Sequence, residues 1–451
     1  MKPQDLWPLF NLRDTPYFQE ALRPGDGARY PVEWFIGREV EGDRLARTIL
    51  GHAGSSRQTI RGSVGVGKST LAQHVKAILA PERLYSNPDA VALGHADGSD
   101  EVCIRILSYV YEALLSAGQE QDKLTALEKN EAVQNTRQMV RVFRETTGLS
   151  GGVSIPVLGG GMSAGRSTSL NAPGTARPSI LIAQLLRGLF QAARDHLNAR
   201  GIVVHVNNLE NLTDADATKA GAIFRDLRDT ALLLEGYHWL VVGTSSALRA
   251  VVDTHPQLRS VFSLTLALDP LKPSELTRLL ERRYAALAAD SDKPAHPPIA
   301  PRAVQALYTL FQGDLRGTLA ALDEAAHGLL GYGKRPDAAL SLADMQPFLR
   351  RRYEADVRAR LTRSQADDLE KIVQRVRMNT FSVKDAAAAW KKERSRAARI
   401  LAELHKTGYI ISIEQRAATE ERGRPATYYT VSGAALLAFG SDSSQPRLGI
   451  S

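Results

Sequence analysis

The sequence contains little cysteine and no long apolar run. Its 451 residues include one cysteine, Cys103, so the chain cannot build a disulfide framework or a metal site made of several thiolates. Residues 1–6 lack the basic-then-apolar order of a signal peptide. The most apolar stretches, such as residues 180–183, are soon interrupted by polar side chains. We therefore expect a cytoplasmic protein that has no membrane partner.

Basic residues are distributed unevenly along the chain. The formal net charge at pH 7 is +8, and from Arg350 onward lysines and arginines occur in clusters. Concentrated positive charge is compatible with an acidic polymer as partner. The length and the 43% hydrophobic content allow two to four domains, so the basic excess falls in one C-terminal unit of a multidomain chain.

The first two thirds of the chain alternate between strand and helix patterns, which favours a parallel sheet covered by helices. Between two of the helices, residues 148–174 are rich in Gly, Ser and Pro, which is typical of a surface loop. Apolar alternation at 153–158 also allows a hairpin that projects toward a partner or DNA. Strands are predicted up to Ile60-Arg61 and at 90–93, 202–206 and 239–242, and helices over 39–50, 68–79, 124–145 and 180–197.

A glycine-rich loop follows the first predicted strand. Its sequence, Gly62-Ser63-Val64-Gly65-Val66-Gly67-Lys68-Ser69, fits the complete P-loop pattern and lies between a strand and a helix, as the pattern requires. The glycines let backbone N–H groups surround phosphates, Lys68 supplies charge to the terminal phosphates, and Ser69 can ligate Mg²⁺. We predict that ATP and Mg²⁺ bind here, with Thr70 as a further contact.

The segment upstream of this loop carries a family resemblance. Phe35-Ile36-Gly37-Arg38-Glu39-Val40-Glu41 resembles the segment before the P-loop in the origin-recognition and initiator-loader branch of AAA+ ATPases, and in related signalling P-loop ATPases. In these families the segment lies over the adenine, which implies that Phe35 and Ile36 contact the base. The alternative is a plain helix entry in which Arg38 is solvated. The resemblance spans about residues 34–348 and continues into the next domain.

The predicted strand at 202–206 is followed by Asn207-Asn208-Leu209-Glu210, where such families place the acidic Walker B segment. By resemblance, Asn207 replaces the aspartate that organises Mg²⁺, and Asn208 replaces the acid that orients the attacking water. An amide brings no negative charge, so metal affinity and water activation should both decrease. Glu210 is the nearest substitute. Its alternative role is that of a solvated carboxylate at a helix start.

Three further positions follow from the resemblance. Thr244, after the strand at 239–242, matches the sensor-1 position. Arg316, in Gly313-Asp314-Leu315-Arg316, matches the sensor-2 arginine that reaches the phosphates from a helical lid. Arg259 falls where an arginine finger for a neighbouring subunit lies, which implies a homo-oligomer. For both arginines the alternative is an ordinary solvated side chain.

The last hundred residues resemble a winged helix-turn-helix. Helices predicted near 364–376, 382–390 and 394–407 precede strand patterns at 409–413 and 427–431, which a charged turn joins. This class places its third helix in the major groove and its wing near the backbone, so duplex DNA is the expected partner. The alternative is a protein-binding winged helix with a solvated basic face. The residues expected at DNA are Lys391, Lys392, Arg394, Arg396, Arg399, Arg422 and Arg424.

These patterns predict an α/β fold of the P-loop AAA+ type with a parallel sheet, a helical lid and a C-terminal winged helix. The expected function is ATP binding, nucleotide-dependent assembly on DNA and slow hydrolysis, and a protein partner in a DNA-processing or defence system is compatible with it. A signalling P-loop switch and a non-hydrolysing DNA-binding regulator remain as alternatives. The expected units are an N-terminal arm (1–33), the AAA+ core (34–270, with an insertion at 148–177), the lid (271–348), the winged helix (349–440) and a flexible tail (441–451).

Overall fold

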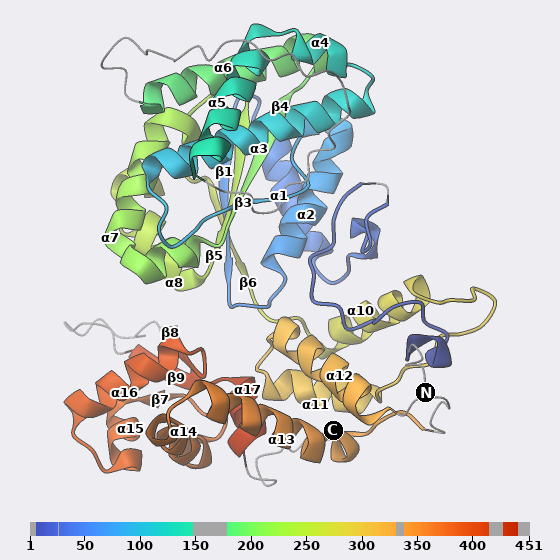
Figure 1. Ribbon diagram of the computed structural model, residues 1–451, viewed down its shortest axis with the longest axis vertical. Helices are drawn as coiled ribbons and strands as arrows, with labels where there is room; N and C mark the ends of the chain where they lie inside the picture. Colours follow the sequence, from blue (N-terminus) through green and yellow to red (C-terminus); the bar gives the residue numbers. More distant parts are fainter. Residues whose placement is uncertain (1–5, 26, 148–177, 331–337, 415–426, 441–451) are drawn as a thin grey trace.

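The computed structural model describes residues 6–25, 27–147, 178–330, 338–414 and 427–440. An α/β core holds the sheet, and a mainly helical layer beside it contains the lid and the C-terminal helices (Figure 1). Three predicted features lie outside the described residues: the Gly-rich insertion, the wing turn with Arg422 and Arg424, and the tail. Within the described ranges, no helix has both the length and the apolar character that a membrane crossing needs.

Six parallel strands form the core sheet, which confirms the predicted α/β class. Their order is β2-β4-β5-β1-β6, and β3 also pairs with β4. The register pairs Arg61 with Gly243 and Val206 with Val241, so β1, β4 and β5 end at one edge of the sheet. All residues of β5 are buried, as expected for a strand covered on both faces. The strands are β1 (Ser56–Gly62), β2 (Leu84–Tyr85), β3 (Val91–Ala92), β4 (Gly201–Asn207), β5 (Tyr237–Gly243) and β6 (Leu264–Leu268).

Helices cover both faces of this sheet. Helices α1 and α2 pack on Ile60 and Val203, whereas α3, α6 and α7 pack on Ile202 and Val204 of the opposite face. The helix predicted over 124–145 is two helices, because the side chain of Asn130 accepts a hydrogen bond from the amide of the second helix at 3.0 Å. The core helices are α1 (Glu39–Leu50), α2 (Lys68–Leu79), α3 (Ser99–Glu120), α4 (Leu124–Glu128), α5 (Glu131–Thr147), α6 (Pro178–Leu197), α7 (Leu209–Leu227), α8 (Ser245–Leu248) and α9 (Pro256–Arg259).

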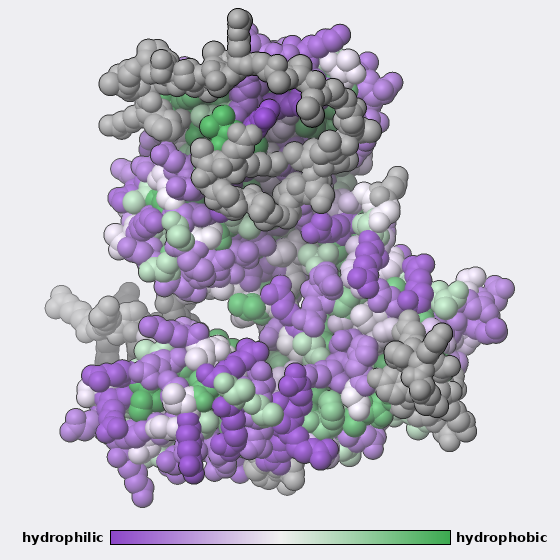
Figure 2. Space-filling view, in the orientation of Figure 1, coloured by the Kyte–Doolittle hydropathy of each residue, from purple (hydrophilic) through white to green (hydrophobic). Residues whose placement is uncertain are grey.

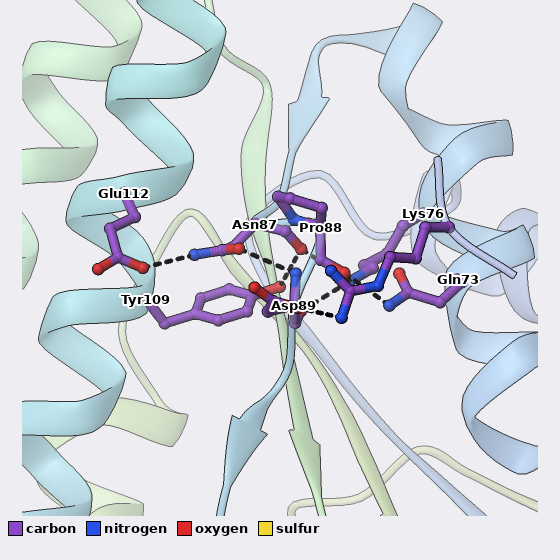
Figure 3. A network of polar contacts seen from close by, with 8 residues as sticks. Gln73, Lys76, Asn87, Pro88, Asp89, Tyr109 and Glu112 are labelled. Carbon is purple, nitrogen blue, oxygen red and sulfur yellow. Dashed lines mark hydrogen bonds and ion pairs between the residues drawn. The ribbon is translucent and has the colours of Figure 1, made fainter. Parts of the chain in front are cut away.

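A buried lysine fixes α2 to the sheet (Figure 3). Lys76 Nζ donates hydrogen bonds to the backbone carbonyls of Asn87, Pro88 and Asp89 at 2.7, 3.3 and 3.0 Å. These three residues connect β2 to β3, so the ammonium group ties this connection to the helix that follows the phosphate loop. Burial lowers the pKa of Lys76 to about 7. Burial, together with the neighbouring Lys76 charge, also keeps the pKa of His205 on β4 well below its usual value.

The N-terminal arm packs against the lid. Apolar side chains of residues 6–32 share one core with the lid helices. Arg283 of α10 is buried under the arm and donates to the carbonyls of Pro16 and Phe18 at 3.0 and 2.9 Å, with its guanidinium 3.6 Å from the Phe18 ring centroid. The arm is therefore structurally part of the lid. The lid helices are α10 (Pro273–Ala286), α11 (Pro301–Leu310), α12 (Leu315–Leu329) and α13 (Leu342–Arg360).

The C-terminal unit has the helix and strand order of a winged helix. Its sheet is antiparallel, in the order β7-β9-β8, and the short strand β7 adds to the two strands predicted from the sequence. Helix α13 runs across the expected boundary at residue 348 and packs against α17, so the lid and this unit share a helix. The elements are α14 (Arg363–Val376), β7 (Phe381–Ser382), α15 (Val383–Trp390), α16 (Arg394–Lys406), β8 (Ile410–Glu414), β9 (Thr427–Val431) and α17 (Gly433–Phe439).

Candidate functional site

The phosphate loop joins β1 to α2. Its glycines Gly65 and Gly67 have left-handed backbones, with φ of 79° and 93°. Lys68 is 9% exposed, and its ammonium donates to the carbonyls of Gly62 and Ser63 at 3.0 and 2.8 Å. The ammonium therefore spans the loop. No side chain caps the start of α2, so its first amide groups are available to an anion.

Electrostatics at Lys68 identify the charged groups that face it. Burial lowers the pKa of its ammonium, the Glu210 and Asp314 carboxylates oppose this shift, and the Arg316 guanidinium adds to it. Both Glu210 and Arg316 therefore lie within electrostatic reach of the loop. Glu210 lies half-buried on α7 and Arg316 lies exposed on α12, and the roles that the sequence assigns to them stay predictions.

The ends of β4 and β5 lie beside the loop. Asn207, the last residue of β4, donates from Nδ2 to Ser69 Oγ at 3.1 Å. Asn208 adopts a left-handed backbone, with φ of 61°, and occupies the N-cap position of α7 without a capping hydrogen bond from its side chain. Glu210 Oε2 accepts a hydrogen bond from the amide of Thr244 at 3.3 Å, which links α7 to the end of β5. The Thr244 hydroxyl accepts from the amide of Ala247 at 3.2 Å, so it serves as the N-cap of α8.

The N-terminus of α12 meets the phosphate loop. A Cβ atom on Gly65 would lie 1.8 Å from Asp314 Oδ1 and 3.3 Å from the Arg316 amide, so only glycine fits at this contact. Asp314 caps α12 by accepting from the Gly317 amide at 3.1 Å. Burial raises the pKa of the Asp314 carboxyl, and backbone hydrogen bonds from α12 oppose this shift. The sequence singled out Arg316 but did not identify Asp314 as the residue in contact with the loop.

The segment expected over the adenine, residues 35–38, contacts α2 and the phosphate loop. Phe35 and Ile36 are half-buried, and the Phe35 ring stacks on His74 of α2 at 3.9 Å between centroids. Arg38 is 6% exposed and donates to the carbonyls of Val66, at 3.2 Å, and Asp269. The alternative of a solvated Arg38 is therefore wrong. Its buried position joins the loop to the start of the lid, and only its place in the quoted motif could have signalled this.

Arg259 lies apart from these groups. It ends the short helix α9 with an exposed side chain. Among the described residues, no hydrogen bond or ion pair joins Arg259 to the phosphate loop. Its expected role concerns a neighbouring subunit and stays a prediction.

Helix α16 presents basic side chains to solvent. Arg394, Arg396 and Arg399 are exposed, as is Lys391 before the helix, whereas the opposite face of α16 is buried. Lys406 is also exposed and, seven residues after Arg399, lies on the same face. Helical spacing would have identified it. In Figure 2, hydrophilic side chains cover much of the visible surface of the layer formed by the lid and the C-terminal helices.

Lys392 differs from its basic neighbours. Its ammonium pairs with Asp368 of α14 at 2.6 and 2.8 Å and lies 5.9 Å from the Trp390 ring centroid. Asp368 is only 5% exposed, so this pair holds α14 to the turn between α15 and α16. A lysine engaged in this way is not available to phosphates without breaking the pair.

The strand order, the loop between β1 and α2, the polar ends of β4 and β5, and the lid helix at the loop define a P-loop fold of the AAA+ type. No family model matches the chain, and no curated protein matches it.

Solved structures with a similar arrangement exist. The Aeropyrum pernix ORC2 protein, solved as ADPNP–ADP complexes, is 15% identical with a TM-score of 0.49, and 94% of each chain is covered. The Aeropyrum pernix ORC1 protein in complex with DNA is 16% identical with a TM-score of 0.44, over 91% of this chain and 93% of that one. The Thermotoga maritima RuvB Holliday junction branch migration motor is 14% identical with a TM-score of 0.39, over 89% and 94%. At such distances the fold assignment stands on the geometry of this chain itself.

Proposed function

We propose that this chain binds ATP at the phosphate loop, binds duplex DNA through α16 and the wing, and assembles on DNA in a nucleotide-dependent manner. One observation supports the nucleotide part above all others: the buried Lys68 ammonium lies across the loop, with the lid helix in contact with Gly65. The exposed arginines of α16 support the DNA part. We also propose the cytoplasm as its location.

The residues at the loop fit a nucleoside triphosphate with Mg²⁺. Open space beside Gly67, the uncapped start of α2 and the Lys68 ammonium suit the phosphates. Ser69 and the Asn207 amide are oxygen donors of the kind that Mg²⁺ accepts, although neither carries a negative charge. Bound Mg²⁺ would neutralise the phosphate oxygens. We propose that the half-buried Phe35 and Ile36 cover the base and that the exposed Arg316 of α12 reaches the phosphates from the lid.

We propose that hydrolysis is slow. Asn207 holds the Ser69 hydroxyl through an amide rather than a carboxylate, and Asn208 offers no general base. Glu210 is the acid that follows the two asparagines, but its carboxylate already accepts from the Thr244 amide. Loss of one positioned base typically costs about a hundredfold or more in rate. Steady-state phosphate release should therefore stay far below one turnover per second, and Glu210→Gln should remove what remains.

Lys68→Ala tests the nucleotide site. We expect it to abolish binding of a fluorescent ATP analogue, because the triphosphate loses its charge-assisted partner. Lys219→Ala is the matched control, since Lys219 is an exposed lysine of α7 outside the loop. Equal affinity of the Lys68→Ala variant and the native chain would exclude the loop as the nucleotide site.

Assembly is tested by sedimentation with duplex DNA, with and without an ATP analogue. Nucleotide should promote self-association. Arg259→Ala should reduce any hydrolysis while ATP binding persists, because an arginine finger acts on the neighbour's nucleotide. A chain that stays monomeric under all conditions would exclude assembly.

A second candidate function is a DNA-binding regulator for which ATP is only a structural ligand. The hydrogen bond from Asn207 to Ser69 favours it, because an amide occupies the place expected for the acid. This candidate predicts nucleotide binding and DNA binding without phosphate release, even with DNA present. Measurable release that Glu210→Gln abolishes would exclude it.

A further inference from the structure

Gln312, in the turn between α11 and α12, forms hydrogen bonds with the winged-helix unit. Gln312 Nε2 donates to the carbonyl of Val431 at 2.7 Å, and Gln312 Oε1 accepts from the Thr430 hydroxyl at 3.0 Å. Both partners belong to β9, whose other end leads from the wing. The amide of Gln312 therefore uses its donor and its acceptor on one strand.

The same turn contacts the phosphate loop two residues later. Asp314 lies against Gly65, at a distance that leaves no room for a Cβ atom. Between these contacts, Gln312 and Gly313 have left-handed backbones, with φ of 54° and 83°. A Cβ on Gly313 would lie 2.3 Å from Pro270, which leads from the core to the lid. The segment 312–314 is thus a compact turn that touches the loop, the core–lid connection and β9.

The segment that follows β9 packs closely against this turn and the lid. A Cβ atom on Gly433, two residues after β9, would lie 2.4 Å from the Phe311 ring. Leu437 of α17 is buried in the lid core. In Figure 2 a gap separates part of the α/β core from the winged-helix unit, and the lid bridges them beside it. Because packed interfaces resist continuous deformation, a change of the lid at the phosphates should displace β9.

We propose that Gln312 is a positioning residue that couples nucleotide binding at the phosphate loop to DNA binding by the winged helix. This inference rests on the proposed function, because it needs both ligands. The contact with the phosphate loop sets the position of Asp314. Because the turn at 312–314 is compact, a shift of Asp314 also moves Gln312. The two hydrogen bonds of Gln312 would then move β9.

The test measures the coupling factor in the full chain. This factor is the ratio of the dissociation constants of a fluorescent, non-hydrolysable ATP analogue without and with saturating duplex DNA. Coupled sites typically give about 5- to 150-fold, so we expect a factor of about five or more in the native chain. Gln312→Leu keeps the volume but removes both hydrogen bonds. It should bring the factor to within about twofold of one, while each ligand alone still binds.

Two further variants separate coupling from folding. Gln312→Gly suits the left-handed backbone, removes the side chain and should lose the coupling as Gln312→Leu does. Gln305→Leu is the matched control, because Gln305 Nε2 bonds Thr277 within the lid at 3.3 Å and does not reach β9. It should retain the native factor.

Each outcome bears on a different statement. Coupling that persists in both Gln312 variants would overturn the inference. A native chain that binds both ligands with a factor of one would also overturn it and would leave the proposed function standing. Failure of the native chain to bind the analogue or the duplex would refute the proposed function itself, and the inference with it.

Discussion

Replacing Asn207 by aspartate is expected to strengthen nucleotide binding only when Mg²⁺ is present. The Asn207 amide lies 3.1 Å from Ser69 Oγ, so an aspartate of nearly the same shape would place a carboxylate beside the hydroxyl that is expected to ligate the metal. Groups that support a metal ligand in this way typically change metal affinity about 10- to 100-fold. This corresponds to about 1.4–2.7 kcal/mol. Without Mg²⁺ the same charge repels the phosphates and should weaken binding.

The assay is equilibrium titration of a fluorescent ATP analogue over a range of Mg²⁺ concentrations and in chelator. Asn208→Asp is the matched control. It adds the same charge one residue later, in a left-handed backbone that aspartate tolerates, where the native asparagine has no hydrogen bond to Ser69 among the described contacts. The reasoning would be refuted if Asn207→Asp left the Mg²⁺ dependence unchanged, or if both variants shifted it equally.

Three further perturbations test separate parts of the structure. Arg396→Ala with Arg399→Ala should weaken binding to every duplex and reduce the slope of log affinity against log salt by about two, measured by fluorescence anisotropy; an unchanged slope would place DNA elsewhere. Gly65→Ala should destabilise the nucleotide-free chain more than Gly67→Ala in urea unfolding. Both incur about 1–2 kcal/mol for a left-handed backbone, but only the first collides with the lid; equal losses would show that the lid contact is weak. Because burial lowers the pKa of Lys76 to about 7 while the unfolded chain keeps its usual value near 10.5, the unfolded state binds the extra proton between these pH values. The free energy of unfolding should thus rise with pH across this window, and Lys76→Met should flatten the rise.

Local pattern was sufficient for the core of the fold. The strand ending at Ile60-Arg61, the glycine-rich loop and the helix from Lys68 to Leu79 were all predicted, because periodicity and turn chemistry act within a few residues. The boundary inside residues 124–145 was missed, since the cap formed by Asn130 competes with a continuous helical pattern.

Side chains that meet residues far along the chain could not be assigned from the sequence. The clusters near α16 made Lys391 and Lys392 look alike, yet only the second pairs with Asp368, which lies on another helix. The sequence left a solvated Arg38 open, whereas in the structure its guanidinium donates to the carbonyls of Val66 and Asp269. Charge and spacing do not reveal such partners.

The sequence by itself determined that this chain has a P-loop on an α/β sheet, amides where acids are expected, and a basic C-terminal unit. These properties depend on residue type, short spacing and periodicity. Only the tertiary structure decided that Asn207 contacts Ser69, that α12 meets Gly65, and that Gln312 joins the lid to β9. Those contacts join segments that are 100 or more residues apart, so they depend on how the sheet, lid and winged helix pack together.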